Sequence, residues 1–487
     1  MPPAQTRPLS TRKLLLIAFV TAFVCITLSS NCSFLYPTNP WSDANCFYTV
    51  GRCLNDGRVL YRDVYEQKGP WLYFLHACVE WIPGQNVNPF LEIYFIEVLA
   101  ATATLFFLAR TILLFRPRRA LAFLPLLAAV IYTCRSYSYG DSVEEFSLVM
   151  ASYVQYVTLR MLRSEEHDMS RASLFFVGVC CGVVFWMKYN TLGFAIGAMI
   201  LPLSCVVRER NWKLLGRSAA FVLLGVAVAT LPVAIYFGVH GAFDALWEAY
   251  FYNNIFLYPE EKTLFEYVRF IFGRTFYLVR SNIAVILFIV VGWVHLVRRK
   301  MRVEALHVFL CMLLVELSSV MGARFYIYYA LMFAPAAVFG VVALDAWIER
   351  VRGKWAARVR GALAAALCLA LLLPSVLLGG IDAERESLFT YRLAKIINQT
   401  PDATMIDLGG LDSGLYTATG ILPVSRFFCR LNLWLPEARM EWYNIIATGA
   451  VDYVYMSRFT LEEYHGADAP YELVAVDEGN HLYRRVQ

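Results

Sequence analysis

The sequence predicts a polytopic α-helical membrane protein that ends in a small soluble α/β domain. Of its 487 residues, 59% are hydrophobic and only 17% are charged, whereas soluble domains carry roughly 25% charged residues. The charge is missing mainly from long apolar runs, and the hydropathy falls after about residue 382. Lys and Arg concentrate in the short segments between the apolar runs, which is the usual pattern of a membrane protein.

A membrane-spanning helix requires about 20 predominantly apolar residues. This criterion predicts about eleven spans, of which the short fifth and sixth are the least regular. They are 13–30, 91–115, 119–136, 146–162, 172–187, 190–207, 217–238, 279–297, 303–322, 326–348 and 361–379. The first run has the charge pattern of a signal peptide, but no small-residue cleavage site follows it, so we expect a retained helix.

The loops between the spans predict the orientation of the chain. Five basic loops occupy every second connection: 116–119, 160–171, 208–217, 298–302 and 349–360. Short loops rich in Lys and Arg remain in the cytoplasm. We therefore expect the alternate connections on the other side of the membrane, namely 31–90, 137–145, 188–189, 239–278, 323–325 and everything after 380.

Two predicted domains follow from this pattern, a transmembrane domain over 1–379 and an extracytoplasmic α/β domain over 380–487. In the first outer loop, the apolar stretch 69–82 is too short to span. Leu72, Leu75 and Val79 recur there at helical spacing, which predicts a helix lying in the membrane interface.

The C-terminal region combines strand-like and helical patterns. A helix is expected over 386–398, and the last strand-like run is followed by a turn and a further run that together indicate a hairpin. The strand-like runs are 403–408, 422–428, 451–456 and 471–476. About a hundred residues is a usual size for an independent domain.

Charge and cysteine content exclude several classes of function. The net charge of +5 is explained by the basic loops, and no basic patch lies within a soluble fold, which argues against nucleic-acid binding. The twelve cysteines show no metal-binding spacing. Cys32, Cys46 and Cys53 share the first outer loop, where a disulfide could form in an oxidising compartment.

The first outer loop, 31–90, contains the strongest candidates for chemistry. Asp43 follows the first span, and Asp63, Glu66 and Lys68 come just before the interfacial helix. A carboxylate at the membrane surface can act as a general base on a hydroxyl, and a lysine can neutralise a phosphate. Lipid-linked phosphates lie at this depth. The alternative is that these residues are ordinary solvated loop charges.

The segment 57–73, GRVLYRDVYEQKGPWLY, resembles the first-loop signature of glycosyltransferases of the GT-C fold. It is most similar to the protein O-mannosyltransferase-like group, which is glycosyltransferase family 39 with its bacterial relatives, including the lipid A aminoarabinose transferases. The resemblance implies a GT-C fold, with Asp43 as the catalytic base. It also implies that Glu66 and Lys68 belong to the site for the phosphate of a polyprenyl-phosphate sugar, and Asp63 is a further candidate there.

The resemblance covers about residues 10–350 and is most specific in the first loop. Many members of the group carry an Asp-Glu pair where this chain has Asp43 followed by Ala44. Any role of the second acidic residue must therefore be absent here or supplied from another position.

Two further segments resemble parts of the same family. Segment 140–146 matches its second outer loop and supplies Glu144 and Glu145 as substrate-binding candidates. Carboxylates also stabilise a helix N-terminus, so capping is the alternative. Lys188 occupies an outer turn where the family has a basic residue. It could contact the phosphate or simply extend toward the interface.

Arg324 and Tyr328 belong to a segment that resembles the family's entry into a late helix, where His is usual in place of Tyr328. Arg324 could bind a phosphate through two hydrogen bonds, or it could anchor its helix beside an interfacial tyrosine belt. Glu92, Glu97 and Glu316 lie inside predicted spans, and such residues face the bundle interior or a cavity.

The predicted function is a membrane glycosyltransferase that moves a hexosyl or pentosyl group from a polyprenyl phosphate to a hydroxyl of a glycan, lipid or protein. The sequence lacks a Walker A motif, a dinucleotide fingerprint and a metal-ligand cluster. We therefore expect inversion without a metal or cofactor, and no nucleotide-sugar donor. The tyrosine- and asparagine-rich loop 239–278 is a candidate cover for the sugar or acceptor.

Two other classes of function remain open at this stage. A transporter or flippase for a lipid-linked substrate would place polar groups along a path across the membrane, and a non-catalytic envelope scaffold would use the C-terminal domain. Polar groups gather at the expected outer side, and no internal repeat is present, which favours the transferase. The pattern favours the plasma membrane of a bacterium, with the active site and the C-terminal domain outside the cytoplasm.

Overall fold

The computed structural model describes residues 9–79, 88–165, 168–350, 355–378, 380–381, 383–466 and 468–486. The chain divides into two compact units. Unit 1 comprises Met1–Ser30, Tyr94–Thr230 and Glu261–Gly379. Unit 2 comprises Asn31–Ile93, Leu231–Glu260 and Gly380–Gln487.

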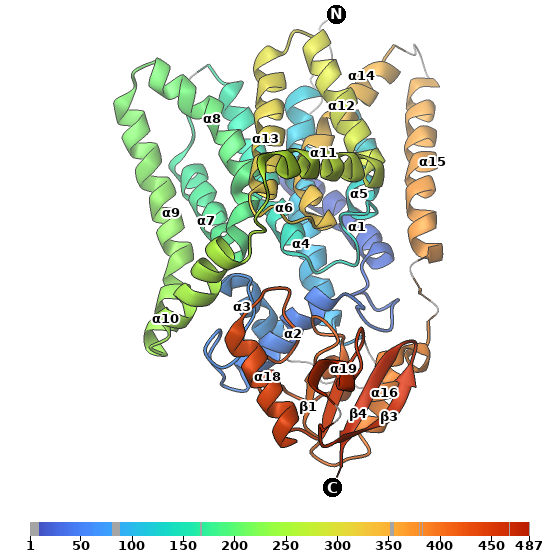
Figure 1. Ribbon diagram of the computed structural model, residues 1–487. Helices are drawn as coiled ribbons and strands as arrows, with labels where there is room; N and C mark the ends of the chain where they lie inside the picture. Colours follow the sequence, from blue (N-terminus) through green and yellow to red (C-terminus); the bar gives the residue numbers. More distant parts are fainter. Residues whose placement is uncertain are drawn as a thin grey trace, which may run out of the picture. The chain divides into compact units, whose positions relative to one another are not determined.

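Unit 1 is built from helices, most of which run side by side (Figure 1). The α-helices are α1 (Thr11–Ser29), α4 (Leu91–Phe115), α5 (Leu124–Tyr132), α6 (Val143–Leu162), α7 (Arg171–Lys188), α8 (Gly193–Arg208), α9 (Trp212–Val239), α11 (Leu264–Ser281), α12 (Ile283–Arg298), α13 (Arg302–Val320), α14 (Val338–Ile348) and α15 (Trp355–Leu378). Short 3-10 segments accompany them: η1 (Arg118–Phe123), η2 (Tyr189–Leu192) and η4 (Ile327–Ala337). Helix α11 lies across the others and meets α12 at 96°.

The helices agree with the predicted spans to within a few residues, and the chain is a multi-pass membrane protein. Within the described ranges, seven helices are long and apolar enough to cross a membrane, or eight if α11 and α12 form one broken span. At the predicted turn 188–189 the 3-10 segment η2 joins α7 to α8, and the three together, Arg171–Arg208, count as one of the seven candidates; their division into two spans stays a prediction. The number of eleven spans stays a prediction, because several of the helices are too short to count as membrane spans by themselves.

Local sequence explains where these helices begin and how closely they pack. The Ser142 side chain accepts a hydrogen bond from the Glu145 amide at the start of α6, and Thr263 forms a capping box with Glu266 at the start of α11. Helices α7 and α9 approach through glycine. A Cβ atom added at Gly178 would lie 2.0 Å from the Val222 carbonyl oxygen.

Unit 2 combines the first loop, the end of α9 with the segment that follows it, and the C-terminal region. Its helices are α2 (Ser42–Asn55), α3 (Pro70–Val79), α10 (Phe243–Leu246), the π-helix η3 (Trp247–Leu257), η5 (Arg385–Ser387), α16 (Phe389–Ile397), α17 (Leu415–Thr419), α18 (Pro436–Thr448) and α19 (Leu461–His465). Its strands are β1 (Met405–Asp407), β2 (Tyr453–Met456), β3 (Tyr471–Asp477) and β4 (Asn480–Arg485). The predicted interfacial helix 69–82 corresponds to α3, and its residues 80–82 lie outside the described part of the chain.

These strands form one mixed sheet in the order β1-β2-β4-β3. Strands β1 and β2 are parallel, with Met405 opposite Tyr453, and both are fully buried. Strands β3 and β4 form the predicted hairpin, and Glu478 and Gly479 at its turn have positive φ angles of 52° and 79°. Two successive residues with positive φ angles are typical of the two-residue hairpin turns whose twist matches that of the flanking strands.

The strand predicted over 422–428 is wrong. This segment is irregular, and Pro423 lacks the amide hydrogen that a ladder position needs. Its backbone is used elsewhere instead: the Tyr65 amide donates to the Arg426 carbonyl at 2.8 Å, and the Asp407 amide donates to the Phe428 carbonyl at 3.3 Å. The segment therefore joins the first loop to β1.

Candidate functional site

Helix α2 places Asp43 in its first turn, where the helix dipole stabilises a carboxylate. The Asn45 side chain donates to the carbonyls of Asn39 and Trp41, at 3.0 and 2.9 Å, and thereby holds the entry to the helix. Asp43 is only 7% exposed. The sequence thus produces a buried carboxylate in a fixed backbone rather than a mobile loop charge.

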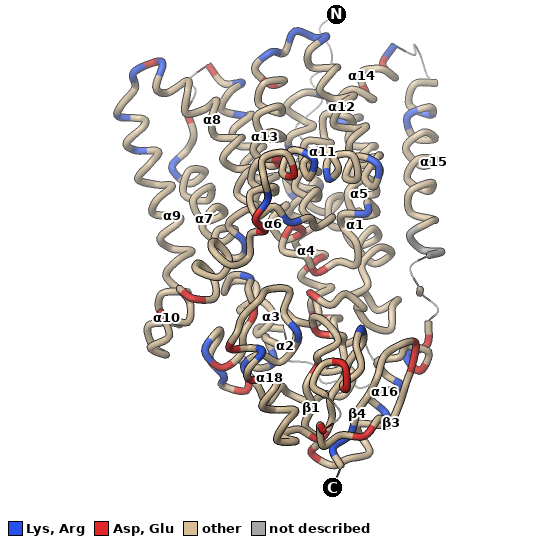
Figure 2. The backbone as a smooth tube through the Cα atoms, in the orientation of Figure 1, with Lys and Arg blue, Asp and Glu red and all other residues tan. Residues whose placement is uncertain are grey.

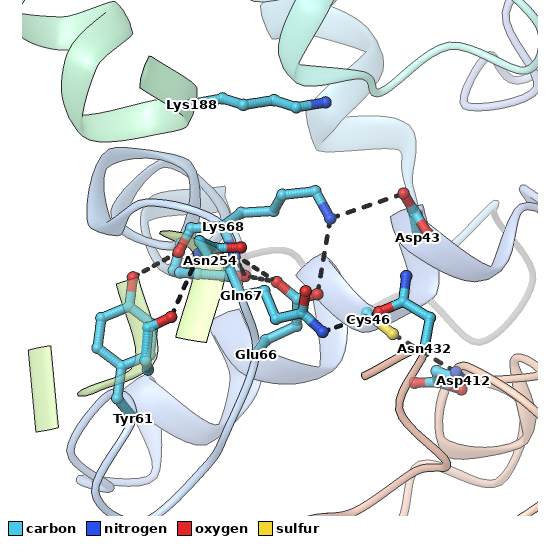
Figure 3. A network of polar contacts seen from close by, with 12 residues as sticks. Asp43, Cys46, Tyr61, Glu66, Gln67, Lys68, Lys188, Asn254, Asp412 and Asn432 are labelled. Carbon is cyan, nitrogen blue, oxygen red and sulfur yellow. Dashed lines mark hydrogen bonds and ion pairs between the residues drawn. The ribbon is translucent and has the colours of Figure 1, made fainter. Parts of the chain in front are cut away.

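Three of the predicted residues lie together, because the Lys68 side chain contacts both Asp43 and Glu66 (Figure 3). We call these three residues the Lys68 cluster. The Lys68 Nζ atom lies 3.8 Å from Asp43 Oδ2 and 3.7 Å from Glu66 Oε1. The ammonium also lies 5.5 Å from the centre of the Phe47 ring. Only 15% of the Lys68 side chain is exposed, so its charge is compensated mainly by these two carboxylates.

Glu66 is held in place by neutral donors. The Lys68 amide donates to Glu66 Oε2 at 2.8 Å, and the Tyr73 hydroxyl donates to the same oxygen. Burial and the Glu66 charge raise the pKa of Tyr73 well above its usual value, so this hydroxyl remains a donor. Glu66 is therefore a fixed anion beside the Lys68 ammonium.

Asp63 lies near this cluster in sequence but contacts other groups. Arg62 Nε is 2.9 Å from one Asp63 oxygen, and the Val59 amide donates to the other at 2.8 Å. The hydrogen bond from Arg62 lowers the pKa of Asp63. A donor-binding role for Asp63 stays a prediction, since these contacts are explained by local loop structure.

Amide side chains that sequence analysis did not assign to the site flank the Lys68 cluster. Gln67 Nε2 donates to Asn432 Oδ1 at 2.8 Å, and Asn254 Nδ2 donates to the Gln67 carbonyl at 2.8 Å (Figure 3). Asn254 comes from η3, in the loop expected to cover the substrate. Asn432 precedes α18, and no motif or pattern in the sequence marks it as a residue of the site.

The segment after β1 holds another part of α2. Thr49 Oγ1 donates to Asp412 Oδ2 at 2.6 Å, and the Asp412 amide donates to Cys46 Sγ at 3.4 Å. The Cys46 thiol is hydrogen bonded to the Cys429 thiol, and all twelve cysteines are free. Cys46 thus has a thiol neighbour, Cys429, that lies outside the first loop.

Asp412 is paired with a second buried carboxyl group, Asp407, which accepts from the amides of Gly409 and Ser413 at 3.1 and 2.7 Å. Both side chains are fully buried. Burial, reinforced by the Asp412 charge, raises the pKa of Asp407 to about 8. Burial likewise raises the pKa of Asp412 to about 6.

These shifts predict a pH-dependent stability of unit 2. A raised carboxyl pKa means that the folded state prefers the protonated acid, so this stabilisation is complete below about pH 4 and is lost as the pH rises through about 8. We expect the melting temperature of the purified chain to fall by several degrees between pH 5 and pH 8.5.

The Asp407→Asn variant should show a much smaller decline over the same range. Asp402→Asn is the matched control, because Asp402 is exposed on the same domain. Melting curves followed by tryptophan fluorescence provide the measurement. An identical pH dependence in wild type and Asp407→Asn would contradict the assignment.

In unit 1, Lys188, Glu144 and Tyr328 form a second polar group. Lys188 Nζ lies 2.6 Å from Glu144 Oε1. It also lies 4.1 Å from the centre of the Tyr329 ring and 4.8 Å from that of Tyr328, a distance at which an ammonium is attracted to an aromatic face. Arg324, the remaining basic candidate, is half-buried just before η4.

Glu145 has different neighbours from Glu144. The Asp141 amide donates to Glu145 Oε2 at 3.0 Å and to Glu97 Oε1 at 2.7 Å, while Ser30 Oγ donates to Glu97 at 2.6 Å. Gly140, with φ +84°, allows this approach, because a Cβ atom there would lie 2.3 Å from Glu97 Oε1. Glu97 and Glu145 are therefore buried in one hydrogen-bonded network.

Comparison with known proteins defines the fold of the chain. No family model matches the sequence, and no curated protein matches it either. The structure nevertheless has the GT-C fold, with a small C-terminal sheet. It is similar to the crystal structures of ArnT from Cupriavidus metallidurans bound to undecaprenyl phosphate (TM-score 0.62, 12% identity) and in the apo state (0.64, 13%). Each comparison covers 97% of this chain and 97% of ArnT.

Proposed function

We propose that this chain is a membrane glycosyltransferase that transfers a sugar from a polyprenyl-phosphate donor to an acceptor hydroxyl. The observation that carries the proposal is the Lys68 cluster, in which a buried carboxylate and a buried ammonium lie within 3.8 Å of each other. The GT-C fold supports it, and so does the undecaprenyl phosphate bound to ArnT in one of the similar structures. The acceptor belongs to a glycan, lipid or protein of the cell envelope, and the reaction takes place on the outer face of a bacterial plasma membrane.

In this mechanism Asp43 is the general base. Its carboxylate accepts the proton of the acceptor hydroxyl while the hydroxyl oxygen attacks the anomeric carbon. The bond between that carbon and the phosphate oxygen breaks, the configuration inverts, and polyprenyl phosphate leaves with the electron pair. The products are the glycosylated acceptor and protonated Asp43, which returns its proton to water.

Lys68 compensates the negative charge, which is lost from Asp43 and grows on the phosphate during this step. Before transfer its ammonium lies between Asp43 and Glu66. When Asp43 takes up a proton it loses its charge, and the ammonium becomes available to the phosphate as negative charge grows there. Stabilisation of charge that develops only in the transition state accelerates the reaction.

The decisive experiment is a donor panel. Purified full-length chain is incubated with polyprenyl phosphates that carry a hexose, a pentose or an aminopentose, and release of polyprenyl phosphate is measured by mass spectrometry. We expect at least one donor to be consumed when an acceptor extract is present, and to be consumed about 10²–10⁴-fold more slowly by the Asp43→Asn variant. A folded wild-type protein that consumes no donor but moves intact donor across proteoliposomes would instead be a flippase.

A further inference from the structure

Unit 1 contains a large groove that the proposed reaction does not use. It has a volume of about 700 Å³ and is lined by α12, α14 and α15. This volume lies within the range of small-molecule and lipid sites. Helices α12 and α14 pack closely beside the groove, because a Cβ atom at Gly340 would lie 2.7 Å from the side chain of Phe288 and both residues line it. Leu367 of α15 also lines it.

One part of the groove is apolar. Leu287, Val290 and Val291 of α12 line it, and all three are exposed. In a multi-pass membrane protein, an exposed patch of aliphatic side chains marks a site of contact with lipid. Trp347 near the end of α14 is also exposed and lines the groove, as aromatic residues do at the membrane interface.

The other part of the groove is basic. His295, Arg298 and Arg299 from the last turn of α12 line it, together with Arg350 beyond α14. Lys and Arg gather at this same end of the helices in unit 1 (Figure 2). In the described part of the chain, no carboxylate forms an ion pair with Arg298, Arg299 or Arg350.

The neighbouring acidic residues are already neutralised. Asp345 lies 2.7 Å from Arg116 Nε and 2.9 Å from Arg360 Nε, and Glu349 pairs with Arg116 and Arg119. Among the described residues, the three arginines of the groove are therefore left without a paired carboxylate, next to an apolar wall. Basic pockets between membrane helices are suited to anionic lipid headgroups.

We propose that this groove binds an anionic phospholipid of the surrounding membrane. The phosphate of the headgroup contacts Arg298, Arg299 and Arg350, and an acyl chain lies along Leu287, Val290 and Val291. The arginines select the negative charge, while the apolar wall gives affinity for the chain. The proposal is independent of the transferase reaction, since none of these residues belongs to the Lys68 cluster.

Native mass spectrometry of the detergent-purified chain tests the proposal with two probes, dioleoylphosphatidylglycerol and dioleoylphosphatidylcholine. We expect the wild type to retain phosphatidylglycerol and release phosphatidylcholine. The Arg298→Gln/Arg299→Gln/Arg350→Gln variant should lose apparent affinity for phosphatidylglycerol roughly a hundredfold. The control replaces three basic residues of another loop, Arg208, Arg210 and Lys213, by Gln and should retain the lipid.

A second measurement does not depend on the folding of the triple variant. Dibrominated phosphatidylglycerol should quench wild-type tryptophan fluorescence by an amount that the Trp347→Phe variant lacks. Equal retention of both lipids, or equal losses in the triple variant and its control, would overturn the proposal. A lipid-free dimer without retained phosphatidylglycerol would assign the groove to a second copy of the chain, and would also overturn it.

Discussion

Asp43→Asn is expected to lower kcat for sugar transfer by about 10²–10⁴-fold, the range that a positioned general base contributes. Asparagine has nearly the same shape as aspartate but cannot accept the proton of the acceptor hydroxyl. Donor binding should change little, because Lys68 keeps its contact with Glu66 at 3.7 Å. The measurement is the initial rate of polyprenyl-phosphate release, together with the donor KM.

Asp56→Asn is the matched control for this experiment. Asp56 is the C-cap residue of the same helix, α2, and its side chain is about half exposed beside Arg58. Asp56→Asn should melt within a degree or two of the wild type, because surface changes seldom exceed about 0.5 kcal/mol, and the melting curve of Asp43→Asn establishes that this variant is folded. A variant of Asp43 with transfer near the wild-type rate would remove this residue from the role of base.

Much of the fold could be predicted because its signals are local. The apolar runs predicted spans whose ends agree with helices such as α4 at 91–115 and α13 at 302–320. The hairpin of β3 and β4 was visible in the turn residues between two strand-like runs. By contrast, the run 422–428 has the composition of a strand, but long-range contacts with the first loop and β1 determine its conformation.

The candidate site could be predicted only in part, for the same reason. Asp43, Glu66 and Lys68 lie in one loop, so a short stretch of sequence contains all three. Asp412 and Asn432 contact α2 and Gln67 from more than 360 residues away in sequence. Neither residue belongs to a recognisable motif or to a periodic pattern. Each makes a single long-range polar contact, and such a contact depends on the tertiary fold alone.

Lys68→Met is the second variant for which we expect a large effect. Methionine keeps an unbranched stem and can retain the packing against Phe47, but it removes the ammonium that lies between Asp43 and Glu66. Loss of one partner from a buried charge pair costs about 2–5 kcal/mol. Applied to the proposed contact with the donor phosphate, a loss near the lower end of this range lowers kcat/KM for the donor about a hundredfold.

The same variant tests the coupling between proton uptake and phosphate departure. If neutralisation of Asp43 releases the Lys68 ammonium to the phosphate, the two residues act in one step, and the Asp43→Asn/Lys68→Met double variant should be less impaired than the product of the single effects. Groups that share a contact show coupling of roughly 0.5–3 kcal/mol. Lys395→Met, an exposed lysine on α16, controls for the loss of a charge. Strictly multiplicative effects would mean that Lys68 does not act through Asp43, and an unchanged kcat/KM for the donor would remove Lys68 from the phosphate site.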